Sequence, residues 1–164
     1  MILIAIGANL PVGHQLPLAT CRAALKDLSD KGIEIVRVSS WYESPAWPPS
    51  VQPNFVNGIA EVKTALSPER LLQVLHGIEA AYGRTRGAKN AARTLDLDLI
   101  TYDDVIQTGP PELPHPRMAD RAFVLAPLCE IAPDWVHPVI GVPAAALIEK
   151  IFENQPINRI SESG

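Results

Sequence analysis

The sequence predicts an α+β fold in which an antiparallel sheet carries its helices on one face. Two observations lead to this prediction. Short apolar runs suited to strands alternate with two segments whose apolar residues recur at spacings of three and four, as along one face of a helix. The order of these elements is strand, helix, strand, strand, helix, strand, and two consecutive strands in the middle are typical of an antiparallel sheet.

Apolar periodicity defines the first three elements. Residues 2–7 are an apolar run that predicts a buried first strand. A helix is expected over residues 17–30, and Gly32 ends it. Residues 33–41 predict a second strand, because they are rich in β-branched side chains. The apolar stripe of the helix consists of Leu18, Cys21, Leu25 and Leu28.

A proline-rich loop separates the second strand from the remaining elements. Residues 43–54 contain four prolines, which exclude a helix or a central strand there. A third strand is expected over residues 55–64. Ser67 and Pro68 then have the residue types of an N-cap and a first helical position, and Gly83 marks the end of that helix.

The fourth strand completes this order and ends at about residue 102. The segments expected after it are a tight turn at 103–104, a short strand at 105–106, a proline-rich loop over 107–117, helices near 119–128 and 143–152, and a tail without periodicity from residue 154. We therefore expect a single domain over residues 1–164, with the ferredoxin-like βαββαβ arrangement and C-terminal additions.

Composition narrows the classes of function. With 47% apolar and 20% charged residues, the chain resembles ordinary soluble globular proteins. Its net charge of −4 argues against a general affinity for nucleic acid or anionic membranes. The apolar N-terminal run is too short for a signal peptide or a spanning helix. Cys21 and Cys129 lie far apart, so we expect free thiols, a reducing compartment and a cytoplasmic protein.

The run over residues 93–100 is the most informative segment. Its leucines predict a buried strand, and alternation along that strand places Asp96 and Asp98 on one face. Two carboxylates about 7 Å apart repel each other by about 2 kcal/mol at an effective dielectric constant of about 20. A cation would relieve this repulsion, and Mg²⁺ takes carboxylates together with substrate phosphates. A strand with a solvated acidic face would have the same pattern, so that reading stays open here.

Four cationic residues precede the two aspartates. They are Arg84, Arg86, Lys89 and Arg93, and no acidic residue occurs among residues 80–95. A basic run alone is more often a solvated surface. Guanidinium groups nevertheless suit phosphate oxygens, so a carboxylate pair beside four cations favours a site for a metal-bound polyphosphate.

The run over residues 93–100 resembles the signature of the 6-hydroxymethyl-7,8-dihydropterin pyrophosphokinases of folate biosynthesis. Further resemblances follow in order over about residues 1–135, which makes a chance match improbable. The other segments that carry the resemblance are residues 4–10, 39–45, 52–57, 78–79 with 83–86, 113–118 and 121–125.

This resemblance implies transfer of pyrophosphate from ATP to the hydroxymethyl oxygen of the dihydropterin, with release of AMP. It implies two Mg²⁺ ions with ATP as the co-substrate, and Asp96 and Asp98 match the metal ligands. We expect an in-line displacement without a covalent intermediate. The expected partners are ATP and 6-hydroxymethyl-7,8-dihydropterin, without nucleic acid or membrane, and we expect a monomer.

The resemblance also assigns individual residues. The expected catalytic residues are Arg84, Arg93, Asp96 and Asp98. The expected ATP contacts are Glu79, Arg86, Lys89, His115 and Arg121. The expected pterin contacts are Ser44, Pro45, Trp47, Phe55, Asn57 and Phe123. A flat pterin needs aromatic stacking and a polar group at its edge, which the two phenylalanines and the amide would supply.

Two other classes of protein share parts of this pattern. A non-catalytic ferredoxin-like module could bind a small molecule or a metal, but it would not need two aspartates beside four cations. Another metal-dependent transferase could use an Asp-x-Asp pair, but such enzymes usually carry an alternating βαβ nucleotide domain, which the order of elements lacks. The chain departs from the family pattern at residues 89–92, His76 and Pro110-Pro111, which leaves loop closure and the adenine contacts open.

Overall fold

The computed structural model describes residues 1–83 and 93–161. Its strands form one antiparallel sheet in the order β5-β1-β4-β3-β6, and β2 also pairs with β4. The strands are β1 (Ile2–Ala8), β2 (Glu34–Val38), β3 (Tyr42–Ser44), β4 (Phe55–Lys63), β5 (Asp96–Tyr102) and β6 (Asn158–Arg159). The helices are α1 (Pro17–Asp30), α2 (Pro68–Ala81), α3 (Ala122–Ile131) and α4 (Ala144–Glu149), with a 3-10 turn, η1, at Met118–Asp120.

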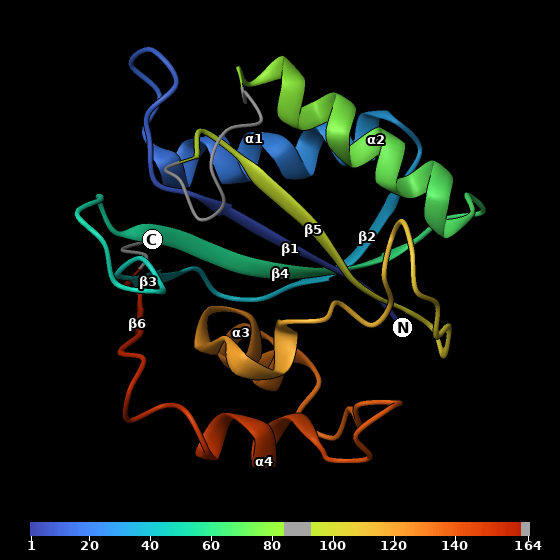
Figure 1. Ribbon diagram of the computed structural model, residues 1–164. Helices are drawn as coiled ribbons and strands as arrows, with labels where there is room; N and C mark the ends of the chain where they lie inside the picture. Colours follow the sequence, from blue (N-terminus) through green and yellow to red (C-terminus); the bar gives the residue numbers. More distant parts are fainter. Residues whose placement is uncertain (84–92, 162–164) are drawn as a thin grey trace.

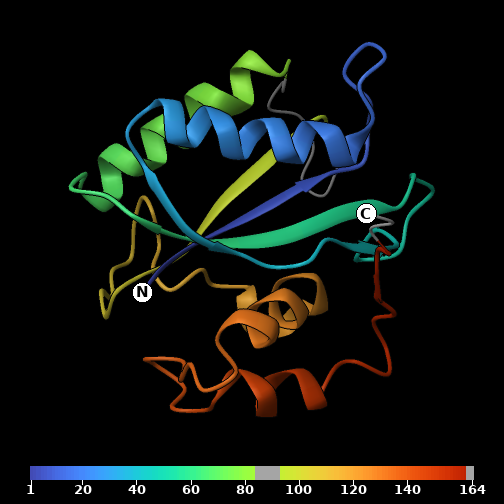
Figure 2. The same cartoon turned by 180° about the vertical axis from the view of Figure 1, so that it is seen from behind.

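The sheet is covered on both of its faces (Figure 1). Helices α1 and α2 lie together on one face, and this confirms the predicted βαββαβ arrangement. Helices α3 and α4 lie on the opposite face, which the view from behind also shows (Figure 2). The C-terminal additions are therefore a third layer, which closes the second face of the sheet.

Alternation along the strands divides the apolar residues between two cores. In β1, Ile2, Ile4 and Ile6 pack toward α1 and α2, whereas Leu3 belongs to the core beneath α3 and α4. This is the consequence of a side-chain period of two in a strand that is buried on both faces. β1 has no solvated face, and this is why its sequence is almost continuously apolar.

Both predicted helices of the first half begin and end as expected. In α2, the Ser67 hydroxyl accepts a hydrogen bond from the Arg70 N–H at 3.2 Å, and Pro68 occupies the first turn. Gly83 follows with a φ of +80°, a conformation that glycine adopts at no steric cost. The free thiol of Cys21 is buried inside α1, as its place on the apolar stripe predicted.

The predicted strand over residues 33–41 is wrong in its continuity, because a β-bulge divides it. Val38 lies opposite Ala60 and Tyr42 lies opposite Asn57, so three residues on one side oppose two on the other. The Ser39 hydroxyl accepts the Ile59 N–H at 2.9 Å within this irregularity. The chain beyond the bulge forms β3, whose last two residues belong to the segment predicted as a loop.

Several expectations for the additions also need correction. The turn at residues 103–104 forms, but residues 105–106, which the structure describes, are not a strand; Gln107 instead bridges to Leu113. Helix α3 begins three residues later than predicted, after η1, and α4 is shorter than predicted. The tail, for which only the absence of periodicity was noted, contains β6, which pairs with β3. Within the described ranges, no helix combines the length and the apolar character that crossing a membrane requires.

Candidate active site

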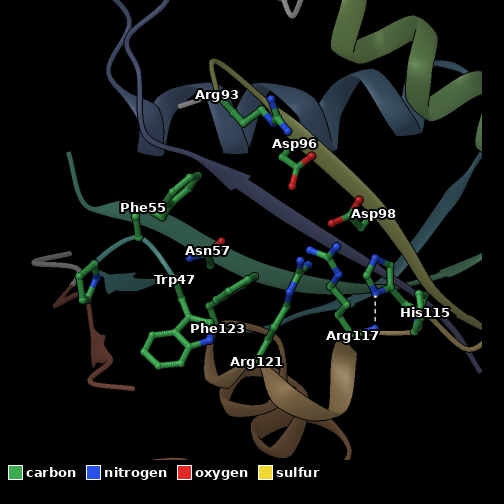
Figure 3. Close-up of a pocket in the computed structure, with 13 residues that line it drawn as sticks. Trp47, Phe55, Asn57, Arg93, Asp96, Asp98, His115, Arg117, Arg121 and Phe123 are labelled. Atoms are coloured by element: carbon green, nitrogen blue, oxygen red, sulfur yellow. Dashed lines mark hydrogen bonds between the residues drawn. The ribbon is translucent and has the colours of Figure 1, made fainter. Parts of the chain in front are cut away.

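A cavity of about 260 Å³ lies where β4 and β5 face the start of α3 (Figure 3). Its walls come from segments far apart in the sequence: the loop after β3, strands β4 and β5, the second proline-rich loop at residues 107–117, and α3. The residues that line it are Pro45, Ala46, Trp47, Phe55, Asn57, Arg93, Asp96, Asp98, His115, Pro116, Arg117, Arg121 and Phe123. Ten of these thirteen residues are ones for which the sequence predicted a role.

The two aspartates reach this cavity because of the alternation along β5. Leu97 and Leu99 are buried in the core beneath α1 and α2. Asp96 and Asp98 therefore lie on the opposite face of the strand, and both line the cavity. The prediction that the two carboxylates share one face is confirmed. Within the described residues, no third His, Cys, Asp or Glu joins them in a group that could hold a metal ion.

Small residues of β1 lie between the two sides of the cavity in the sheet register. Gly7 lies between Asn57 of β4 and Asp96 of β5 in the sheet register. Ala5 lies two residues earlier on the same face and pairs with Asp98. A Cβ atom at Gly7 would stand 2.6 Å from the Asn57 Oδ1 atom, so this position admits no side chain while the amide keeps its place.

The Asn57 amide is buried, and a hydrogen bond to a neighbouring strand fixes its orientation. Only 7% of Asn57 is exposed, and its Nδ2 atom donates to the Ser44 hydroxyl at 3.2 Å. Ser44 itself does not line the cavity of about 260 Å³. The predicted contact of Ser44 with the pterin is therefore not supported by the lining of this cavity. The contact that Ser44 does make orients the Asn57 amide.

Aromatic side chains flank the amide. Figure 3 shows Phe55 from β4 and Phe123 from α3 on opposite sides of the cavity, with Asn57 between them. Trp47 lies beside Phe123 at the outer wall and is 37% exposed. This end of the cavity can therefore accept a flat ring with polar groups at its edge.

Guanidinium groups gather at the opposite end. Arg93 precedes β5, Arg117 comes from the proline-rich loop and Arg121 stands at the start of α3. Burial lowers the pKa of Arg121, whereas the nearby Asp98 and Asp96 raise it. The Arg121 guanidinium also lies 5.3 Å from the centre of the Phe123 ring, which joins the charged end to the aromatic end.

His115 enters this charged end as a neutral group. Burial lowers its pKa to about 4, and the positive charge of Arg121 acts in the same direction, while Asp96 and Glu112 oppose them. Its Nδ1 atom accepts the backbone N–H of Arg117 at 3.2 Å (Figure 3). An Nδ1 acceptor in a neutral ring leaves the proton on Nε2, so the ring can donate a hydrogen bond to an anion.

Asn9 holds together three segments around the cavity, a role that the sequence alone did not suggest. Its Nδ2 atom donates to the Gln52 side chain and to the Pro53 carbonyl, each at 3.0 Å. Its Oδ1 atom accepts the Arg93 N–H at 2.8 Å. One buried amide thus ties the end of β1 to the proline-rich loop of residues 43–54 and to the start of the aspartate strand.

Glu79 lies apart from the cavity. It is 4% exposed on α2, and its carboxylate accepts the backbone N–H of Leu97 at 2.8 Å. This bond fixes the strand between Asp96 and Asp98 from the opposite face of the sheet. Its predicted contact with ATP stays a prediction, and its observed contact positions the aspartate strand.

Three predicted residues cannot be placed, and three lining residues were not predicted. Arg84, Arg86 and Lys89 lie outside the described residues. The sequence missed Ala46, Pro116 and Arg117 as lining residues. Arg117 stands two residues after His115 on the same loop, and that spacing was the signal that could have indicated it.

Comparisons with known proteins show which proteins the chain is similar to. The family model described as 7,8-dihydro-6-hydroxymethylpterin-pyrophosphokinase matches residues 3–133. The chain is 45% identical over 150 residues to the 2-amino-4-hydroxy-6-hydroxymethyldihydropteridine pyrophosphokinase of Synechocystis sp., which covers 90% of this chain and 74% of the relative. It is 42% identical over 137 residues to the protein of the same name from Haemophilus influenzae, covering 82% of this chain and 83% of the relative.

Among solved structures, the fold is similar to wild-type HPPK-DHPS of Plasmodium falciparum. The TM-score is 0.70 at 14% sequence identity, and the match covers 91% of this chain. The present chain spans only 44% of that longer chain. The likeness therefore concerns the fold of one part of the longer protein.

Replacing Gly7 with alanine should destabilise the protein, because the new methyl group would force the Asn57 amide to move. We expect Gly7→Ala to lower the free energy of unfolding by roughly 1–3 kcal/mol in urea denaturation. Gly77→Ala is the matched control, since a Cβ at this exposed helical position meets no atom within 4 Å. That control should be stabilised by about 1 kcal/mol. Equal stability of the two variants would contradict the role given to Gly7.

The lowered pKa of His115 predicts a loss of stability in mild acid. In the unfolded chain, His115 binds a proton below about pH 6.5. In the folded protein it stays neutral until the pH falls to about 4. The free energy of unfolding should therefore fall as the pH falls through this window, and His115→Asn should remove that part of the slope. His137, whose pKa burial also lowers, is present in both proteins and cancels. A His115 imidazole that titrates near pH 6.5 by NMR would contradict the assignment.

Proposed function

Because the chain belongs to the 7,8-dihydro-6-hydroxymethylpterin-pyrophosphokinase family, we propose that it transfers pyrophosphate from ATP to the hydroxymethyl group of 6-hydroxymethyl-7,8-dihydropterin. As a member of this family, it is a pyrophosphokinase of folate biosynthesis. In the proposed reaction the hydroxymethyl oxygen attacks the β-phosphorus, and the bond from that phosphorus to the oxygen bridging toward the α-phosphorus breaks. The products are the pterin diphosphate and AMP, without a covalent enzyme intermediate.

One observation carries this proposal: a single cavity has a charged end and an aromatic end on either side of Gly7. Two carboxylates and three guanidinium groups line the charged end. Two phenylalanines and a buried amide line the aromatic end. A nucleotide polyphosphate suits the first and a pterin suits the second, so the register of the sheet would bring the two substrates next to each other.

The proposed pterin site uses rings and one amide. Phe55 and Phe123 would stack on the two faces of the bicycle, and the Asn57 amide would meet its edge with both a donor and an acceptor. Pro45 and Trp47 would close the outer wall. Ser44 would contribute by orienting the amide through its hydrogen bond of 3.2 Å.

The proposed nucleotide site uses fixed positive charge. Arg93, Arg117 and Arg121 would bind phosphate oxygens, and His115 would donate from Nε2 while it stays neutral. These groups need no proton transfer to act, so their contribution is charge stabilisation and alignment of the reacting oxygen. Arg84, Arg86 and Lys89 are proposed as further phosphate contacts from the resemblance alone.

The donor set at Asp96 and Asp98 fits magnesium. Both are oxygen ligands that line the cavity, and within the described residues no third metal-binding side chain completes the group. Mg²⁺ commonly takes one or two carboxylates and completes its shell with water and substrate phosphates. Two bound Mg²⁺ ions would neutralise phosphate charge and lower the pKa of the attacking hydroxyl group. We also propose a cytoplasmic location, where the free Cys21 and Cys129 would stay reduced.

The reaction is tested by incubating the protein with ATP, Mg²⁺ and 6-hydroxymethyl-7,8-dihydropterin and measuring AMP. We expect AMP to form only when the pterin and the metal are both present. The matched control omits the hydroxyl group by using 6-methyl-7,8-dihydropterin, which has no attacking oxygen. ADP in place of AMP, or AMP formation that ignores the pterin, would refute the proposed transfer.

Removing one carboxylate should separate chemistry from folding. We expect Asp98→Ala to lower kcat by about three orders of magnitude, which corresponds to about 4 kcal/mol of barrier. Its thermal unfolding should stay close to that of the wild type, because the side chain lies at a partly exposed cavity wall. Asp104→Ala removes an exposed carboxylate from the turn after the same strand and should leave kcat unchanged. Full activity of Asp98→Ala would exclude the proposed metal ligand.

A further inference from the structure

The segment after α4 returns to the start of α3 and places a buried amide there. Gln155 is 7% exposed. Its Nε2 atom donates to the Asp120 carbonyl at 2.7 Å, and its Oε1 atom accepts the Ala122 N–H at 2.9 Å. One side chain thus bonds to the backbone on both sides of Arg121, from 34 positions further along the chain.

These two bonds flank a residue whose backbone N–H is weakly held, although its carbonyl accepts the N–H groups of Val124 at 3.1 Å and Leu125 at 2.9 Å. Arg121 is the N-cap of α3, with an extended φ of −122° and ψ of 111°, and no side chain of its own caps the helix. Its N–H reaches the Met118 carbonyl only at 3.4 Å. The first N–H groups of a helix have no partner within the helix, so Gln155 supplies the partner that Ala122 needs.

The direction of the Arg121 side chain depends on this backbone. Its guanidinium lies in the cavity, where Asp98 and Asp96 act on it electrostatically. The guanidinium stands at the end of a long side chain, so a small rotation at the backbone of Arg121 displaces it much further. In addition, Gln155 and Pro156 share a small hollow with Trp47 and Phe123, which places the returning segment directly behind the cavity wall.

We propose that Gln155 is a positioning residue for Arg121, and that the C-terminal segment thereby sets the geometry of the phosphate end of the site. The inference rests on the proposed function for its effect on turnover. Residue 155 lies outside residues 3–133, which the family model matches.

A double-mutant cycle tests whether Gln155 acts through Arg121. Gln155→Leu keeps the approximate size and removes both hydrogen bonds. We expect it to lower kcat/KM for ATP by between about tenfold and a hundredfold, the usual cost of a misplaced reactive group, with a smaller change in KM for the pterin. In an Arg121→Ala background the same change should cost less than about twofold, because the group it positions is gone. Independent, multiplicative losses would overturn the proposal.

A purely structural role is excluded by a matched variant of the same layer. Leu147→Ala truncates a buried residue of α4 that packs beneath α3 without touching Gln155's two bonds. It should lower the melting temperature while kcat/KM of the folded protein stays near the wild-type value. If Gln155→Leu does not fold, the same cycle is run with Gln155→Glu, which keeps an acceptor for the Ala122 N–H but replaces the donor to the Asp120 carbonyl with a negatively charged oxygen. Equal kinetic losses in Leu147→Ala and the Gln155 variant would overturn the proposal.

A readout without turnover separates this inference from the proposed function. In the ligand-free protein, the Arg121 Nε–H signal in ¹⁵N NMR should report an ordered side chain, and Gln155→Leu should make it mobile. If the wild type forms no AMP but this signal responds, the reaction is refuted and the positioning role stands. If the wild type forms AMP and the signal ignores Gln155, the reaction stands and the positioning role is refuted.

Discussion

Two like charges on one face of a strand oppose each other, and apolar burial on the other face holds them in place. Leu95, Leu97 and Leu99 are at most 4% exposed. Burying a leucine contributes about 1.5–3 kcal/mol, so the three together outweigh a carboxylate repulsion of about 2 kcal/mol. A slip of one residue would expose the leucines and bury the aspartates, so the register of the strand is the constraint on which the site depends. Glu79 holds the beginning of the same strand, and Asn9 holds the residues just before it, through hydrogen bonds of 2.8 Å each.

The cavity is polarised along the sheet. Guanidinium groups from three separate segments face the two carboxylates, and the imidazole among them stays neutral because it is buried beside Arg121. The other end contains no charged side chain among its described walls of Phe55, Asn57, Trp47 and Phe123. Under the proposed function, these walls would direct a charged substrate and a flat, weakly charged one to different ends of the cavity.

Local patterns predicted the parts of this arrangement that depend on neighbours in sequence. The periodicity of α1 and α2, the cap at Ser67 and the alternation around Asp96 are all short-range features, and the structure confirms them. Contacts between distant segments escaped prediction. The bulge before β3 depends on pairing with β4, β6 exists only because β3 offers an edge, and Gln155 is meaningful only beside Asp120 and Ala122. Arg117 escaped prediction as a lining residue because a sequence does not show that its loop folds over the sheet.

Gly7 and Asn57 share one volume of space, since a Cβ at the first would stand 2.6 Å from the Oδ1 atom of the second. The two positions are consequently not free to change one at a time during divergence. A side chain at position 7 displaces the amide at position 57, whereas a smaller residue at 57 would remove that conflict. The order of substitutions is therefore biased, because a change at position 57 lowers the cost of a later change at position 7. A protein of this fold that carries a larger residue at the glycine position is expected to have moved or lost the amide at the other.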